Sequence, residues 1–149
     1  MGLDQYLKAE KHFSAYNGDD EDYKNIIAIA GGESVADDEF RYAAISFTAG
    51  YWRKANQIHQ WFVDNVQDGV DNCSKYYVSL EQLNELLGIC NTVLADHDQA
   101  EELLPTTDGF FFGSTEYGDN YFNDLEETVK ILGRVTSAEE FDYYYVSSW

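Results

Sequence analysis

The segment YWRKANQIHQWFVDNVQDG, Tyr51–Gly69, changes the hydrophobic period of this chain and so decides its fold class. Upstream of it, apolar and polar residues alternate as they do in strands, whereas within it apolar residues recur at a helical spacing. Gly69 is expected to end the helix, because glycine readily takes the left-handed backbone that follows a last turn. The stripe predicted to face the core consists of Tyr51, Ala55, Ile58, Phe62 and Val66.

Strands are predicted on both sides of this helix. Leu3–Phe13 could be a strand, because one set of residues alternates with another: Leu3, Gln5, Leu7 and Ala9 with Asp4, Tyr6 and Lys8. Arg41–Trp52 alternates in a similar way. Lys75–Ser79 and the tail from Ser137 onward are also rich in β-prone residues. The stretch NIIAIAGG, Asn25–Gly32, fits either a short strand or a buried helix.

Two further main helices are predicted. Ser79 and Gln82 form a capping-box pair in front of a leucine-rich stripe that starts at Leu80. Asp119 or Asn120 is expected to cap the last helix. Because strands and helices do not alternate in a βαβ rhythm, the chain is predicted to be a single α+β domain over residues 1–149. About three main helices would pack on a small, mostly antiparallel sheet.

The composition is strongly acidic, with 9 Lys and Arg residues against 28 Asp and Glu residues and a net charge of −19. This charge repels nucleic acid and anionic membranes, so direct binding to either is not expected, and the expected partner is positively charged. Solubility alone also explains such acidity. The chain opens without a signal-peptide pattern and its apolar runs are short, which predicts a cytoplasmic protein with free thiols at Cys73 and Cys90.

The carboxylates gather in clusters that are candidates for partner binding. Carboxylates spaced over a compact surface imitate the phosphates of a duplex and can occupy the basic channel of a nucleic-acid enzyme, although many charge runs are only solvated faces. Trp61 is a further candidate, because Trp is enriched at interface anchors, but another element of the fold would cover it equally well. The candidate residues are Trp61, Asp19, Asp20, Glu21, Asp22, Asp37, Asp38, Glu39, Asp96, Asp98, Glu101 and Glu102.

Three motifs resemble a family of small proteins encoded by bacteriophages and prophages. They are GLDQYL at Gly2–Leu7, GYWRKANQIHQWFVDNVQDGVDNC at Gly50–Cys73 and LLPTTDGFFFGSTEYGDNYF at Leu103–Phe122. The family typically opens Gly-Leu-Asp-Met-Tyr-Leu, so Gln5 stands where it usually has Met. The resemblance implies a phage origin and a role in the host cytoplasm during infection, and it implies no particular activity.

A small-ligand pocket is the alternative to a protein interface. His59 lies within the apolar arc of its helix, where an imidazole needs a partner for each ring nitrogen, and both a satisfied core histidine and a functional one fit that position. The segment GFFFGSTEYGD, Gly109–Asp119, combines glycines, aromatics and acids, as a packed strand or as a pocket wall. The candidate pocket residues are Trp52, His59, Phe111 and Tyr117.

No metal, cofactor or catalytic motif is expected. Cys73, Cys90, His59 and His97 lack the closely spaced pairs that anchor zinc. The segment DNVQDG starts like a calcium loop but has Val66 where an oxygen ligand is needed. The chain contains neither a Gly-x-Ser-x-Gly elbow nor a glycine-rich phosphate loop with a lysine.

The leading hypothesis is therefore a non-catalytic acidic binding protein. It would inhibit a host defence or nucleic-acid-processing complex by imitating nucleic acid, as expected of an anti-CRISPR or anti-restriction protein. A ligand-binding protein or enzyme with a pocket around His59, and a small virion or assembly component, are the alternatives.

Overall fold

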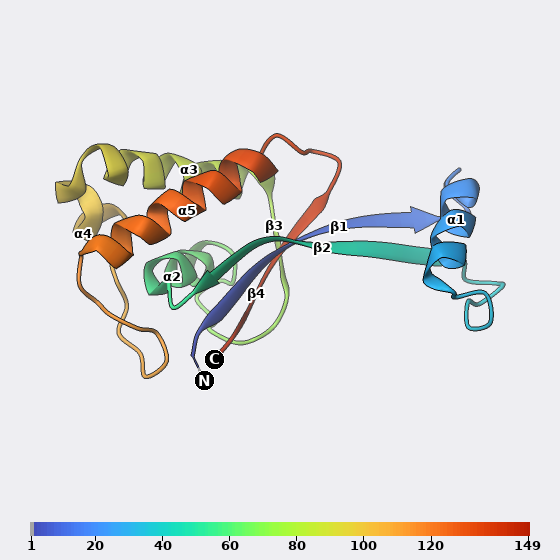
Figure 1. Ribbon diagram of the computed structural model, residues 1–149, viewed down its shortest axis with the longest axis horizontal. Coiled ribbons are helices and arrows are strands. Elements are labelled where there is room, and N and C mark those ends of the chain that lie inside the picture. The colour runs from blue at the N-terminus through green and yellow to red at the C-terminus, as the bar shows by residue number, and fades with distance from the viewer. Residues whose placement is uncertain (1) are drawn as a thin grey trace. The chain divides into compact units, whose positions relative to one another are not determined.

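Strands and helices are mixed along the chain in an α+β arrangement, as the sequence predicts (Figure 1). The computed structural model describes residues 2–149. In chain order, the elements are β1 Asp4–Ser14, α1 Asp20–Ala30, β2 Tyr42–Arg53, α2 Asn56–Asn65, β3 Tyr76–Val78, α3 Leu80–Ala95, the 3₁₀ helix η1 His97–Gln99, α4 Ala100–Leu103, α5 Asp119–Val135 and β4 Asp142–Ser148.

The four strands form one antiparallel sheet in the order β2-β1-β4-β3. In the β3–β4 pair, Tyr76 lies opposite Tyr145 and Val78 lies opposite Tyr143. Side chains alternate along β4, with Tyr143 and Tyr145 buried and Tyr144 on the other face against the ring of Tyr77. The sheet therefore has one face that carries the core.

The chain divides into two compact units, which are described separately. Unit 1 comprises the chain up to Ala9 together with Thr48–Trp149, and unit 2 comprises Glu10–Phe47. Both β1 and β2 have residues in each unit. The single-domain organisation expected from the sequence stays a prediction.

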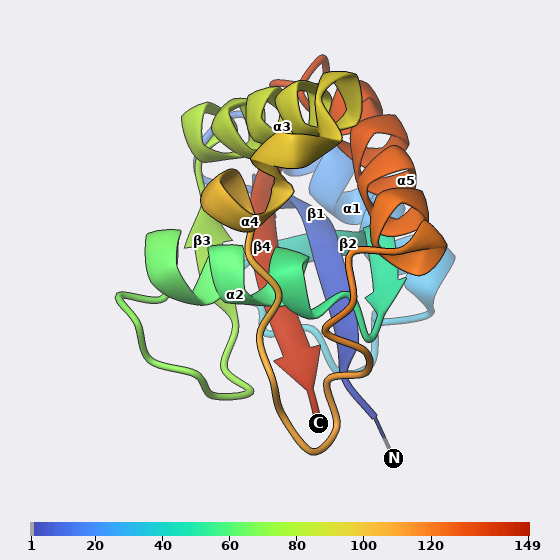
Figure 2. The ribbon, with the colours of Figure 1, turned by 90° about the vertical axis from the view of Figure 1, so that its left-hand side faces the viewer.

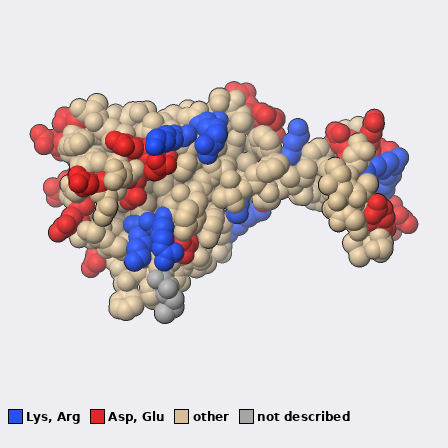
Figure 3. All heavy atoms as spheres, viewed as in Figure 1, with Lys and Arg blue, Asp and Glu red and all other residues tan. Residues whose placement is uncertain are grey.

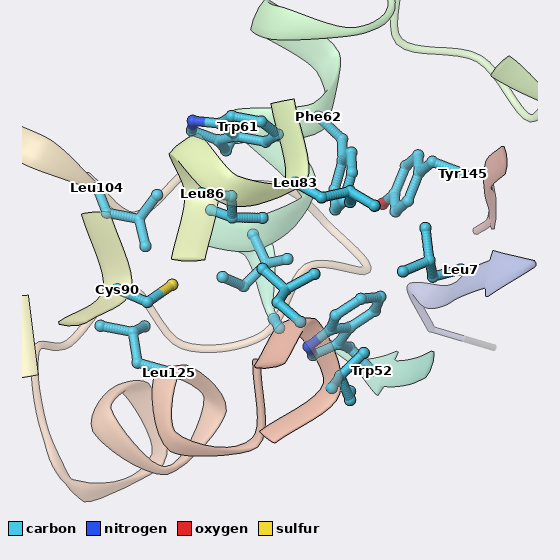
Figure 4. Packing of buried hydrophobic residues seen from close by; sticks show 14 of the residues in the cluster. Leu7, Trp52, Trp61, Phe62, Leu83, Leu86, Cys90, Leu104, Leu125 and Tyr145 are labelled. Carbon is cyan, nitrogen blue, oxygen red and sulfur yellow. The ribbon is translucent and has the colours of Figure 1, made fainter. Parts of the chain in front are cut away.

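The core of unit 1 is built around Phe62 on α2. Its ring stacks on that of Tyr145 with the centroids 4.0 Å apart and the planes at 8°. Trp61 and Trp52 pack against the same ring at 5.3 and 6.2 Å. Figure 4 shows these rings next to smaller apolar side chains from β1, from α3, from the residue after α4 and from α5. The other labelled residues are Leu7, Leu83, Leu86, Cys90, Leu104 and Leu125.

Helices α3 and α5 lie side by side in unit 1 (Figure 2). Ser79 Oγ accepts a hydrogen bond from the backbone of Gln82, and the Gln82 side chain accepts one from the backbone of Ser79, so the predicted capping box starts α3. Leu83 and Leu86 face inward from α3, and Leu125 and Leu132 do so from α5. The predicted leucine stripe of α3 thus packs against the buried face of α5.

The predicted start of the core helix is wrong. Tyr51 belongs to β2 and is 47% exposed, and its hydroxyl donates to Asp4 at 2.5 Å. Lys54 takes a left-handed backbone with φ 59°, which ends the strand, and α2 begins only at Asn56. Ala55 and Ile58 are buried, as the helical period predicts. Tyr51 matches that period by coincidence, because the chain turns between it and the helix.

The expected number of about three main helices is also too low, because five α-helices are present in residues 2–149. The Asn25–Gly32 stretch lies mostly in α1, where Tyr23 is the one buried residue and Ile29 is 88% exposed. Without a buried stripe, its periodicity does not separate helix from strand. Helix α4 is a single turn that ends before Pro105.

Candidate functional site

His59 is completely buried in unit 1, and both of its ring nitrogens are hydrogen-bonded. Nδ1 lies 2.7 Å from the hydroxyl of Tyr145, and Nε2 lies 3.0 Å from Oδ1 of Asp71. A carboxylate oxygen only accepts, so Nε2 carries the proton and Nδ1 accepts from Tyr145 in the neutral ring. Burial lowers the pKa of His59, against the attraction of Asp71. Gln5 Oε1 on β1 lies 3.3 Å from the same hydroxyl, whose single proton is donated to Nδ1 of His59 in this arrangement.

The other candidate pocket residues lie in different surroundings. Trp52 is 3% exposed, and its indole nitrogen donates to Thr128 at 2.8 Å. Phe111 is half-buried, and its carbonyl accepts from Leu3. Tyr117 is exposed, and its hydroxyl accepts from the backbone of Thr106 at 3.2 Å. These side chains are occupied by contacts within the fold.

A polar cavity of about 310 Å³ opens beside these residues, where β2 ends and α2 and α5 begin. Its walls come from three parts of unit 1: the end of β2 with the start of α2, the loop after Gly113, and the first turns of α5. Neither His59 nor Trp52 lines it. The lining includes Arg53, Lys54, Gln57, Glu116, Asn120 and Asp124.

The loop that forms one wall is held by a buried amide. Asn56 is 1% exposed, and its Nδ2 donates to the carbonyls of Phe112 and Ser114 at 3.1 and 2.9 Å. Its Oδ1 accepts from the backbone of Thr107 at 2.8 Å. Every hydrogen-bonding group of this side chain is thus used to fix the loop, which gives the cavity a defined wall.

Two polar side chains of the lining, Gln57 and Asp124, are hydrogen-bonded to each other. Gln57 is 2% exposed, and its Nε2 donates to Oδ2 of Asp124 at 3.2 Å. Burial raises the pKa of Asp124 to about 6, while the hydrogen bond from Gln57 acts in the opposite direction. A buried amide and a partly buried carboxyl that line one cavity are typical of a binding site for polar molecules.

Two of the acidic clusters lie in unit 2, at the start of α1 and in the loop before β2. Among the described residues, Asp20 is the only member of these clusters with an ion pair, to Lys24 at 2.5 Å and Arg41 at 2.7 Å. These contacts lower the pKa of Asp20. Two backbone N–H groups, from Phe40 and Glu39, hold the pKa of Asp37 below its ordinary value. The remaining five acids face solvent without a cation: Asp19, Glu21, Asp22, Asp38 and Glu39.

Unit 2 also exposes many large apolar side chains. Tyr23 is its single buried hydrophobic residue among those described, and the guanidinium of Arg41 lies over its ring at 5.3 Å. Of the twelve large hydrophobic residues that are exposed within the described chain, six lie in this unit, although it contains only about a quarter of the chain. They are Tyr16, Ile29, Val35, Phe40, Tyr42 and Phe47.

The third acidic cluster lies in unit 1, on η1 and α4 and just before them. Figure 3 shows carboxylates gathered over the end of unit 1 where α3, α4 and α5 meet. Within the described chain, Asp96, Asp98, Glu101 and Glu102 make no ion pair, and Asp96 caps η1 by accepting from the backbone of Asp98. Trp61 is 6% exposed and packs against Phe62 as part of the core of unit 1.

In residues 2–149, no group of three or more His, Cys, Asp or Glu side chains is arranged to hold a metal ion. None of the helices described combines the length and apolar composition that crossing a bilayer requires.

Both cysteines are free, and they are expected to differ in reactivity. Cys73 is exposed, so a thiol reagent should modify it at once in the native protein. Cys90 is fully buried and its pKa is raised to about 12 by burial, so it should react only after unfolding. Titration of thiols with and without denaturant measures this difference. Two rapid equivalents in native buffer would contradict the burial of Cys90.

Comparisons with known proteins add no relative. No family model matches the chain, and no curated protein or solved structure matches it significantly.

Proposed function

We propose that this protein is a non-catalytic binding protein that docks on a positively charged protein through unit 2. The observation that carries the proposal is the coincidence, in one small unit, of unpaired carboxylates and exposed aromatic and aliphatic side chains. Exposed apolar residues rimmed by charge are typical of surfaces that bind another protein.

Charge complementarity identifies the class of partner. Unit 2 carries nine acids against three bases, a net charge of −6, and two of the three bases, Lys24 and Arg41, are already paired with Asp20. A basic surface would therefore meet carboxylates that no group of unit 2 neutralises. Tyr16, Phe40 and Tyr42 would supply the apolar contacts that usually carry most of the affinity.

The resemblance to phage-encoded proteins gives the proposal its biological setting. In that setting, the protein acts in the host cytoplasm during infection and inhibits a defence or nucleic-acid-processing complex, as an anti-CRISPR or anti-restriction protein would. The exposed carboxylates would occupy the site of the duplex phosphates. This part of the proposal rests on the sequence motifs and the net charge.

The first test is capture of the partner. The tagged protein is incubated with host lysate at about 0.1 M and about 0.5 M NaCl, and the retained proteins are identified by mass spectrometry. We expect a basic nucleic-acid-binding protein that is lost at the higher salt concentration, because salt screens exposed charges. Addition of duplex DNA should displace it if the two compete for one surface. A captured partner that binds the protein and DNA together would exclude mimicry.

Charge reversal then locates the interface. The variant Glu21→Lys, Asp22→Lys, Asp38→Lys, Glu39→Lys changes exposed acids of unit 2 and should weaken binding at least about tenfold, the equivalent of about 1.4 kcal/mol. The matched control replaces the exposed acids Glu81, Glu85, Glu126 and Glu139 of unit 1 by Lys and changes the net charge equally.

Equal weakening by both variants would show that only net charge matters and that unit 2 is not the interface. Reversal of Asp96, Asp98, Glu101 and Glu102 tests the cluster in unit 1 in the same assay. Circular dichroism should show that all variants keep their fold, since exposed charges contribute little to stability.

A further inference from the structure

Lys54 is unusual among the cationic side chains of residues 2–149, because its ammonium group makes no hydrogen bond, ion pair or ring contact. The other eight Lys and Arg side chains each make at least one such contact within the described chain. Acids outnumber bases 28 to 9 in this protein, so a lysine without a carboxylate partner is unexpected. Lys54 lines the polar cavity of unit 1.

The fold holds Lys54 in place at some cost. Its backbone is left-handed, which is unfavourable for a residue with a side chain, and its N–H donates to the carbonyl of Leu3 at 2.8 Å. Its side chain runs past two glycines: a Cβ on Gly113 would lie 3.0 Å from Cβ of Lys54, and one on Gly2 would lie 3.1 Å from Cε. Strained residues that their surroundings fix in this way cluster at functional sites.

The cavity also presents hydrogen-bond acceptors. Oε1 of the buried Gln57 accepts no hydrogen bond from the part of the chain that the structure describes. Nε2 of the same amide donates to Oδ2 of Asp124. The carboxyl of Asp124 and the exposed carboxylate of Glu116 belong to the same lining. The cavity is therefore lined both by a lysine that has no partner within the described chain and by acceptors that have unused capacity.

We propose that this cavity binds a small zwitterion of the amino-acid type, whose carboxylate pairs with Lys54 and whose ammonium group donates to Gln57 and Asp124. A simple anion would meet the carboxylates of Asp124 and Glu116 as well as the net charge of −19, and a simple cation would meet Lys54 and Arg53. A zwitterion matches both sets of groups. The volume of about 310 Å³ is at the lower end for ligand pockets, which suits a molecule of this size.

The proposal is independent of the protein interface in unit 2, because every residue that it uses belongs to unit 1. The test is titration of the full chain, labelled with ¹⁵N, with each of the twenty L-amino acids. Acetate, methylammonium, glucose and inorganic phosphate serve as comparison probes. We expect at least one amino acid to shift the Gln57 side-chain amide and the Lys54 backbone amide in a saturable way, and the four comparison probes to shift them at least tenfold more weakly.

Matched variants assign the binding to Lys54. Lys54→Met keeps the length of the stem and removes the charge, and it should weaken amino-acid binding at least tenfold. Lys54→Arg should retain much of the affinity, and Asp124→Asn should reduce it. Lys130→Met is the control, because Lys130 lies on α5 in an exposed pair with Glu127 and away from the lining. It should bind like the unmodified protein.

Three outcomes would overturn the proposal. They are saturation by none of the amino acids, equal binding of any of the four comparison probes, and unchanged affinity in a folded Lys54→Met variant. If Lys54→Met does not fold, Asp124→Asn decides: undiminished amino-acid binding by that variant also overturns the proposal. Partner capture by unit 2 is measured separately and does not depend on these results.

Discussion

Replacement of Phe62 by alanine is expected to lower the free energy of unfolding by about 3–5 kcal/mol. The ring is completely buried and stacks on Tyr145, and it also contacts Trp52 and Trp61. Truncation removes the transfer free energy of the ring and leaves a cavity among rigid aromatic neighbours, which cannot collapse to fill it. Urea denaturation followed by tryptophan fluorescence measures the change.

The matched control is Phe110→Ala. The Phe110 ring is 95% exposed, so this substitution should change the free energy of unfolding by no more than about 0.5 kcal/mol. A Phe62→Ala variant as stable as this control would mean that α2 does not present Phe62 to the core.

The second large effect is expected for His59→Ala, which should cost about 2–4 kcal/mol of stability. The substitution leaves a cavity and removes the group that the buried hydroxyl of Tyr145 contacts at 2.7 Å. Asp71 is partly exposed and can be solvated again, so most of the cost should arise at Tyr145. Comparison of His59→Ala, Tyr145→Phe and the double variant gives their coupling, which should exceed about 0.5 kcal/mol for groups in contact.

The pH dependence of stability offers a further check on the same residue. Because burial lowers the pKa of His59, the unfolded chain binds a proton more readily than the folded one. The neutral ring therefore contributes stability above the ordinary His pKa of about 6.5, and that stability decreases as the pH falls through this value. The difference in unfolding free energy between the unmodified protein and His59→Gln should shrink between about pH 7.5 and pH 5.5.

The prediction would be contradicted by a His59→Ala variant that is as stable as the unmodified protein but no longer binds its partner or ligand. That outcome would assign His59 a functional role in place of the structural one. The measurement thus distinguishes the proposed interface in unit 2 from the alternative of a functional pocket around His59.

Much of the fold can be read from local patterns. The alternation in Leu3–Ala9 correctly predicts which side chains of β1 are buried, because a strand places every second residue on the same face. The capping pair Ser79 and Gln82 correctly places the start of α3. The leucine stripe that follows predicts its buried face, since residues three or four apart share one side of a helix.

Local patterns fail where distant segments decide the outcome. Tyr51 fits a helical period, but the backbone at Lys54 turns the chain, and the Tyr51 side chain joins Asp4 from β1. The helix α1 has no buried stripe to identify it, so its sequence left strand and helix equally open. In both places the period of the sequence carries too little information about packing.

For the candidate sites, the sequence likewise predicts some features and misses others. The acidic clusters and the net charge follow directly from the sequence, as does the expectation that His59 needs two partners if buried. The sequence does not identify those partners, Asp71 and Tyr145, which lie 12 and 86 residues away.

The polar cavity around Lys54 combines three segments that are adjacent only after folding. Periodicity and charge are local properties of a chain, so most strands, the main helix faces and the net charge could be predicted from it. Which polar groups meet depends on how those faces pack, so the cavity can be recognised only in the folded protein.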